Sequence, residues 1–97
     1  MASYVMLLKY TSQGAKAISD TTKRAAAAAD MAGKMGVKIR EVLWTMGAID
    51  LVLICDAGND EAMAAVAVKL ASAGNVSTQT LRAFSSKEVD AILAKAK

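Results

Sequence analysis

Two short segments of this chain are apolar at both odd and even positions, and this feature restricts its fold more than any other. They are SYVMLLKY at residues 3–10 and LVLIC at residues 51–55. Their length and composition favour strands over helices. Because successive side chains of a strand point to opposite faces of a sheet, such strands need both faces covered, which is typical of central strands.

The run from Thr22 to Met35 predicts a long helix. It contains five consecutive alanines, at residues 25–29, and alanine has the highest helix propensity. Ser19 or Asp20 can cap its beginning, and Gly36 suits the position just after its end. We expect this helix to pack closely on a sheet.

The middle and the later part of the chain predict a hairpin, a second helix and a fourth strand. Residues 37–46 begin with alternating polarity, Gly47 interrupts the pattern, and the apolar run 51–55 follows. Asn59 is a suitable cap for a helix that Gly74 closes. Residues 76–84 are β-branched and half polar, as an edge strand tolerates.

The clearest local signal lies near the C-terminal end of the sequence. Ser85 and Glu88 have the spacing of a capping box, and Phe84 and Val89 occupy the positions of a hydrophobic staple. They predict a short final helix whose apolar side comprises Val89, Ile92 and Leu93.

The predicted order is strand, helix, strand, strand, helix, strand and final helix. This is the α+β class, with a ferredoxin-like βαββαβ arrangement, a C-terminal helix and a four-stranded antiparallel sheet. We expect residues 1–97 to form a single domain. Helices can cover only one face of so small a sheet, so we expect a homo-oligomer, a dimer or higher, in which a second copy covers the other face.

Three stretches carry a resemblance to a known family. YVMLLKYTSQG, WTMGAIDLV and GNVSTQTLRAF resemble the GYD family of small proteins across nearly the whole chain. The resemblance implies a dimeric α+β barrel, in which ferredoxin-like protomers pair through their sheets. Gly47 and Asp50 match the motif that names the family, whereas Ile49 stands where the family has tyrosine. An activity that depends on that phenol is therefore not implied for this chain.

Composition excludes several kinds of function. The net charge is +3 and the basic residues are scattered, whereas nucleic-acid binding requires a clustered basic footprint. The chain has no histidine, which excludes histidine-based nucleophile pairs and histidine metal ligands. We predict no cofactor, no bound metal, no nucleic-acid partner and no membrane association. A single cysteine and the lack of a recognisable leader favour a cytoplasmic protein.

Two residues raise the question of reactivity. Cys55 lies inside an apolar run, so a packed thiol is favoured over a nucleophile. Asp50 is a weak catalytic candidate as a base, but it is also well placed to accept hydrogen bonds from backbone N–H groups in the hairpin turn.

Other residues are candidates for binding a ligand. The presence of glycine at position 47 is better explained by a need for a positive φ than by the close approach of a ligand. The candidate ligand-binding residues are Tyr4, Tyr10, Trp44, Gly47, Asp50 and Arg82, although packing also accounts for the aromatic ones.

Three functions remain open from the sequence. The first is a small-molecule binding or sensing module. The second is a cofactor-independent monooxygenase or isomerase that acts on a small aromatic or phenolic compound, with Asp50 as base. The third is an assembly subunit whose only role is oligomerisation. Whether the chain is an enzyme is left undecided, although the lack of histidine lowers the number of proton-transfer groups.

Overall fold

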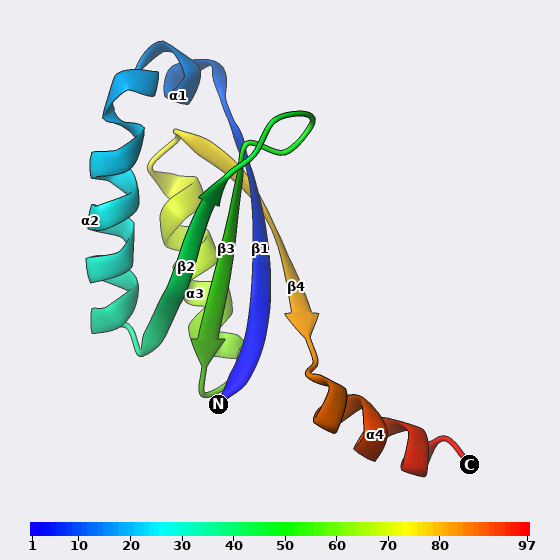
Figure 1. The fold of residues 1–97 in the computed structure, drawn as a ribbon. Coiled ribbons are helices and arrows are strands. Elements are labelled where there is room, and N and C mark those ends of the chain that lie inside the picture. The colour runs from blue at the N-terminus through cyan, green and yellow to red at the C-terminus, as the bar shows by residue number, and fades with distance from the viewer.

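The computed structural model describes residues 1–97 and contains a four-stranded sheet and four α-helices (Figure 1). In chain order the elements are β1 (Ala2–Tyr10), α1 (Ser12–Lys16), a 3₁₀ turn η1 (Ile18–Asp20), α2 (Thr21–Lys34), β2 (Val37–Trp44), β3 (Leu51–Ala57), α3 (Asp60–Ser72), β4 (Val76–Ala83) and α4 (Ser86–Lys95).

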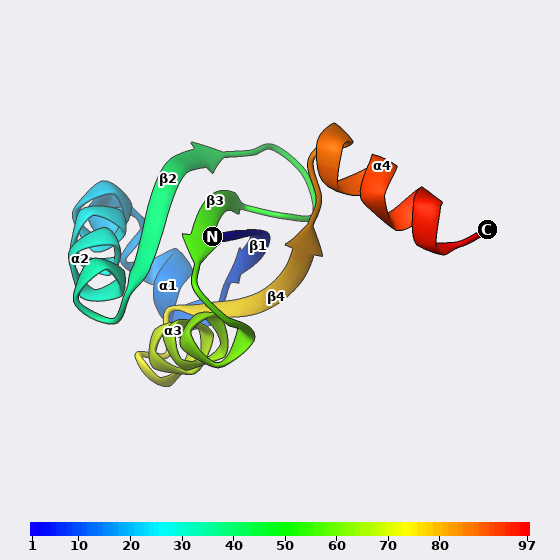
Figure 2. The ribbon, with the colours of Figure 1, turned by 90° about the horizontal axis from the view of Figure 1, so that it is seen from below.

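The sheet has the order β2-β3-β1-β4, and every neighbouring pair is antiparallel. The fold is therefore α+β and ferredoxin-like, as the sequence predicts. The two strands that are apolar at both parities, β1 and β3, occupy the centre. Figures 1 and 2 show α2 and α3 on one side of the sheet, whereas no helix covers the other side.

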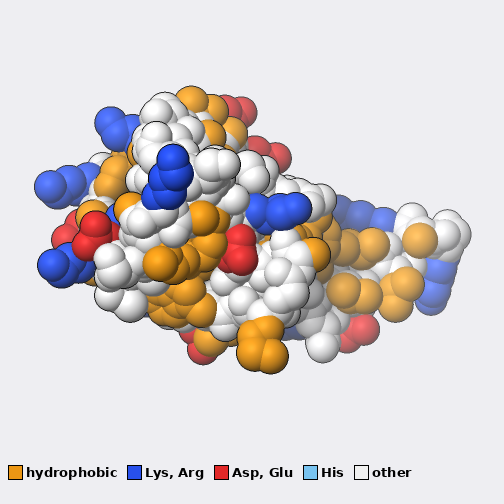
Figure 3. Space-filling view, turned by 90° about the horizontal axis from the view of Figure 1, so that it is seen from above, with side chains coloured by type: hydrophobic (Ala, Val, Ile, Leu, Met, Phe, Trp, Pro, Cys, Tyr) orange, Lys and Arg blue, Asp and Glu red, His pale blue; other side chains and the backbone are white.

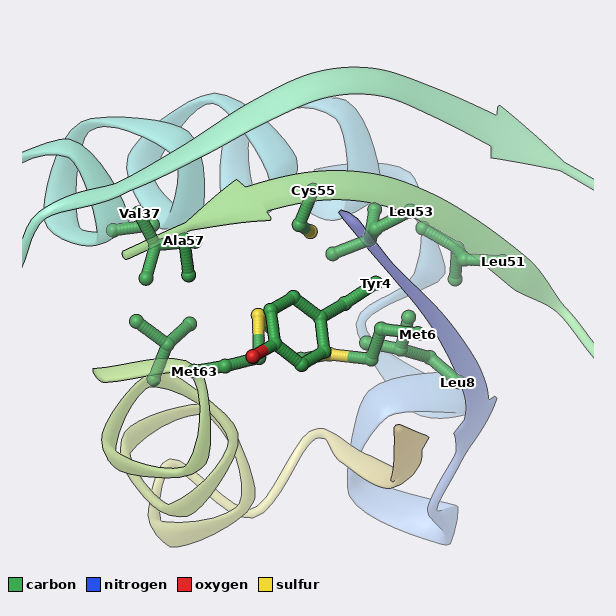
Figure 4. Packing of buried hydrophobic residues seen from close by; sticks show 11 residues of the cluster. Tyr4, Met6, Leu8, Val37, Leu51, Leu53, Cys55, Ala57 and Met63 are labelled. Atoms are coloured by element: carbon green, nitrogen blue, oxygen red, sulfur yellow. The ribbon is translucent and has the colours of Figure 1, made fainter. Parts of the chain in front are cut away.

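The core lies between the sheet and these two helices. Tyr4, Met6 and Leu8 of β1 are buried there, and they face the helices together with alternate residues of β3. Figure 4 shows Met63 of α3 beside the ring of Tyr4. The complete buried cluster is Tyr4, Met6, Leu8, Ala32, Val37, Leu51, Leu53, Cys55, Ala57, Met63 and Val66.

Several predicted helix ends are confirmed, but the predicted side-chain cap of α2 is not, because Asp20 occupies the N-cap position without making a capping hydrogen bond. Asn59 accepts a hydrogen bond from the N–H of Ala62 at 2.8 Å and caps α3. Ser85 and Glu88 form the capping box of α4. Gly36 has a φ of +83° just after α2, as a helix-terminating glycine does.

Three features depart from the sequence expectations. The short α1 and η1 precede α2, and their polar sequence gave no helical pattern. A bulge at Arg40 shifts the register of β2 against β3. The final helix forms, but none of its residues is buried, and Figures 1 and 2 show it extending from the end of β4 away from the body.

None of the helices combines the length and the apolar character that crossing a membrane requires.

Candidate functional site

A cavity of about 380 Å³ lies between α2, α3 and the helix-facing side of the sheet, at the end of the molecule nearest α1. Thirteen of its eighteen lining residues are hydrophobic. Figure 3 views this end of the molecule, where hydrophobic side chains reach the surface with charged side chains around them. The lining residues are Leu8, Tyr10, Thr21, Arg24, Ala25, Ala27, Ala28, Met31, Ile39, Val42, Leu51, Leu53, Lys69, Leu70, Ser72, Ala73, Asn75 and Val76.

Three alanines form part of the wall that α2 contributes to the cavity. Ala32, in the last turn of α2, is fully buried. Earlier in the helix, Ala25, Ala27 and Ala28 border the cavity instead. A methyl group does not span the distance from the helix to the sheet. The expected close packing of α2 on the sheet therefore holds at Ala32, whereas part of the alanine run borders a space.

One hydroxyl group joins two of the candidate aromatic residues at the rim of this cavity. Thr21 Oγ1 lies 2.8 Å from the hydroxyl of Tyr10, and it accepts a hydrogen bond from Trp44 Nε1 at 3.1 Å. Tyr10 and Thr21 line the cavity, but Trp44 does not. Trp44 is 44% exposed. Tyr10 and Trp44 are thus brought together through the first residue of α2.

Asp50 has a clear structural role beside this rim. Its Oδ2 accepts a hydrogen bond from the backbone N–H of Tyr10 at 2.8 Å, and its own N–H donates to the carbonyl of Leu8 at 2.9 Å. Its carboxylate therefore binds β1, not the N–H groups of the hairpin turn. Asp50 does not line the cavity.

Gly47 lies in the exposed connection between β2 and β3. Its φ is +121°, in the region that favours glycine. A Cβ atom built at Gly47 would meet no atom within 4 Å. The backbone conformation, not crowding, therefore explains this glycine.

Tyr4 and Arg82 belong to a second cluster, away from the cavity. The hydroxyl of Tyr4 donates to the carboxylate of Asp60, and this hydrogen bond raises the pKa of Tyr4. The guanidinium of Arg82 lies 5.6 Å from the centre of the Tyr4 ring and 4.4 Å from that of Phe84, and it pairs with Glu88 at 3.5 Å. This cluster holds the junction between β4 and α4. Neither Tyr4 nor Arg82 lines the cavity.

Cys55 is a core thiol. It is fully buried and unpaired. Burial, with the nearby Asp56 carboxylate, raises the pKa of its thiol to about 11. A group that remains protonated and inaccessible at neutral pH is a poor nucleophile.

Sequence reasoning missed most of the residues that form the cavity, including its two charged residues, Arg24 and Lys69. The alanine run was the one available signal, because consecutive small side chains on a helix can leave space as readily as they allow close packing. The distance between α2 and the sheet decides between the two outcomes, and it depends on elements far apart in the chain.

A family comparison covers nearly all of this fold. The GYD domain model matches residues 4–93. The chain belongs to the GYD domain family. The matched range begins in β1 and ends within α4, so the GYD domain contains nearly the whole sheet, the cavity and the connection that holds Gly47 and Asp50. Comparison of this GYD-domain chain with curated proteins and with solved structures gives no significant match.

Proposed function

We propose that this GYD-domain protein is a small-molecule binding or sensing module, that its ligand occupies the cavity between α2, α3 and the sheet, and that it works as a homo-oligomer. The observation that carries the binding proposal is the cavity itself. Its volume of about 380 Å³ falls in the range of ligand pockets, ~300–1,000 Å³. Its lining is mostly apolar with a few polar groups at the rim, which is the usual composition of such pockets.

The lining favours binding over catalysis. It contains hydroxyl, amide, ammonium and guanidinium groups, but neither a carboxylate nor a thiol. Asp50, the candidate base, instead binds the N–H of Tyr10. A general base must come within hydrogen-bond reach of the proton that it removes. The monooxygenase or isomerase alternative thus has no positioned base in this cavity.

The homo-oligomer is supported by the face of the sheet that no helix covers. On that face Val5 pairs with both Ile54 and Leu81, and Leu7 pairs with Val52. Leu81 is 42% exposed. These apolar residues are contiguous, and monomers seldom leave a large contiguous apolar patch in water. A second copy can cover this face with the same face of its own sheet, which gives a closed two-fold dimer.

The position of α4 adds to this support. Its apolar side chains Val89, Ile92 and Leu93 are all exposed, by 39%, 43% and 58%. Isolated helices of this length are marginal in water and depend on packing. The contacts of Arg82 with Phe84 and Glu88 link the end of β4 to the start of α4. From this junction α4 extends away from the sheet and from the other helices of the same protomer. A neighbouring copy is the surface that α4 needs.

The binding proposal can be tested with N-phenyl-1-naphthylamine, a neutral dye whose fluorescence rises in apolar sites. We expect the dye to bind the wild-type protein. Ala28→Phe places a ring in the cavity and is expected to remove binding. Ala26→Phe is the matched control, because Ala26 is exposed on the same helix and does not line the cavity.

Circular dichroism and thermal melting establish that both variants fold. If Ala28→Phe does not fold, Ala25→Leu provides a smaller obstruction of the same cavity. Equal dye binding by a folded cavity variant and by Ala26→Phe would contradict the proposed site.

A further inference from the structure

The charges at the cavity identify the chemical class of its ligand. We propose that the cavity binds a small carboxylic acid with an apolar body, whose carboxylate lies at Arg24 and Lys69. This inference rests on the proposed function, since it concerns the same cavity. The apolar body is matched by leucine, isoleucine, valine and methionine side chains from β1, β2, β3 and α2.

The charges that line the cavity indicate that the polar group of the ligand is negatively charged. Arg24 and Lys69 are the only charged residues among the eighteen that line the cavity, and both are cationic. The protein has two ion pairs, Arg40 with Asp56 and Arg82 with Glu88, and neither involves a cavity residue. No carboxylate of the protein therefore neutralises the two cations. An anionic ligand supplies the missing charge, whereas a cationic ligand would be repelled.

The guanidinium of Arg24 is held in place before any ligand arrives. Its Nη1 donates to the carbonyl of Ala17 at 2.7 Å, and its Nη2 donates to the carbonyl of Gly14 at 3.3 Å. These contacts use two of the five N–H donors of the group, so others remain for a ligand. A guanidinium matches the planar geometry of a carboxylate, which favours a carboxylate as the anion.

Lys69 contributes from the opposite wall. It lies in the last turn of α3, whereas Arg24 lies in the first half of α2. The two cations thus come from the two helices that border the cavity. Hydroxyl groups of Tyr10 and Thr21 are also in the lining and provide further hydrogen-bonding capacity.

The test compares 2-naphthoate with 2-naphthamide and 2-naphthylmethylamine, which share one apolar body and differ in the charge of the polar group. Calorimetric titration at low ionic strength is expected to show that the carboxylate binds about ten-fold more tightly than the amide. The amine is expected to bind most weakly. Added salt should weaken binding of the carboxylate and leave binding of the amide nearly unchanged.

Variants assign this preference to the two cations. Lys69→Gln and Arg24→Gln are each expected to reduce the preference for the carboxylate over the amide, without weakening amide binding. Lys23→Gln is the matched control, because Lys23 is exposed on α2 beside Arg24 and does not line the cavity. Since Arg24 also holds two backbone carbonyls, Lys69→Gln decides the question if the Arg24 variant does not fold.

The outcomes separate this inference from the proposed function. Equal affinity for carboxylate and amide, with the neutral dye still bound, would overturn the ligand class and leave the binding site intact. An unchanged preference in Lys69→Gln and in folded Arg24→Gln would also overturn it. Failure of every naphthyl compound and of the dye to bind would remove the proposed function itself.

Discussion

The carboxylate of Asp50 accepts a hydrogen bond from the backbone N–H of Tyr10 at 2.8 Å, across forty positions of the sequence. Together with the bond from the N–H of Asp50 to the carbonyl of Leu8, it extends the pairing of β1 and β3 beyond their last paired residues. Asp50, the catalytic candidate of the sequence analysis, therefore connects the two central strands where they border the cavity.

Removal of this carboxylate is expected to destabilise the protein. Asp50→Ala leaves the partly buried N–H of Tyr10 without its partner, which costs about 1–3 kcal/mol in the free energy of unfolding. Asp50→Asn retains a side-chain oxygen and is expected to lose less. Urea denaturation followed by circular dichroism measures both values. Wild-type stability in Asp50→Ala would show that this hydrogen bond contributes little.

The thiol of Cys55 is expected to react slowly in the folded protein. With its pKa raised from 9.0 to about 11, the thiolate fraction at pH 8 falls about 100-fold, and burial restricts access further. Alkylation by iodoacetamide, with and without urea, measures the ratio of the two rates. Equal rates in the folded and unfolded states would show that the thiol is exposed.

The same pKa shift makes stability depend on alkaline pH. The folded state holds the Cys55 proton more tightly than the unfolded chain does, so this contribution to the free energy of unfolding decreases as the pH rises from about 9 to about 11. Cys55→Ala lacks this contribution. Denaturation of both proteins across that range should therefore show a steeper alkaline loss of stability in the wild type.

The open face of the sheet gives a matched pair of variants for the proposed oligomer. Val52 lies at the centre of that face, whereas Val68 is 69% exposed on α3, on the helical side. Val52→Lys is expected to produce monomers, because it places a charge in the proposed interface. Val68→Lys is expected to leave the assembly unchanged. Sedimentation velocity reports the oligomeric state, and a monomeric wild type at micromolar concentration would refute the proposal.

Charge at the start of α4 is expected to make this helix sensitive to acid. The backbone N–H of Ser85 binds the carboxylate of Glu88 and, with the other hydrogen bonds to that carboxylate, lowers its pKa below 4.5. The stabilisation is therefore present above pH 4.5 and is lost as the pH falls through the lowered pKa. Amide chemical shifts of residues 85–95 should report this loss. Glu88→Gln keeps a hydrogen-bond acceptor but does not titrate. The amide chemical shifts of this variant should therefore not change with pH in the same range.

The sequence by itself determined the central strands of this protein and the helix ends that Gly36, Asn59 and Ser85 mark. Residues 3–10 and 51–55 are apolar at both parities, and only the middle of a sheet accommodates that pattern. Caps such as Asn59 and Ser85 act on N–H groups three residues away, so their partners are already present in the local sequence.

Tertiary structure alone decided which face of β1 meets the helices, which group Asp50 binds, and where the cavity lies. Both faces of β1 are apolar, so the sequence pattern does not distinguish them. The partner of Asp50 and the two walls of the cavity come from segments far apart in the chain. The distances between these segments depend on how the helices pack against the sheet. No local pattern of residues encodes the size of the space that remains between the helices and the sheet.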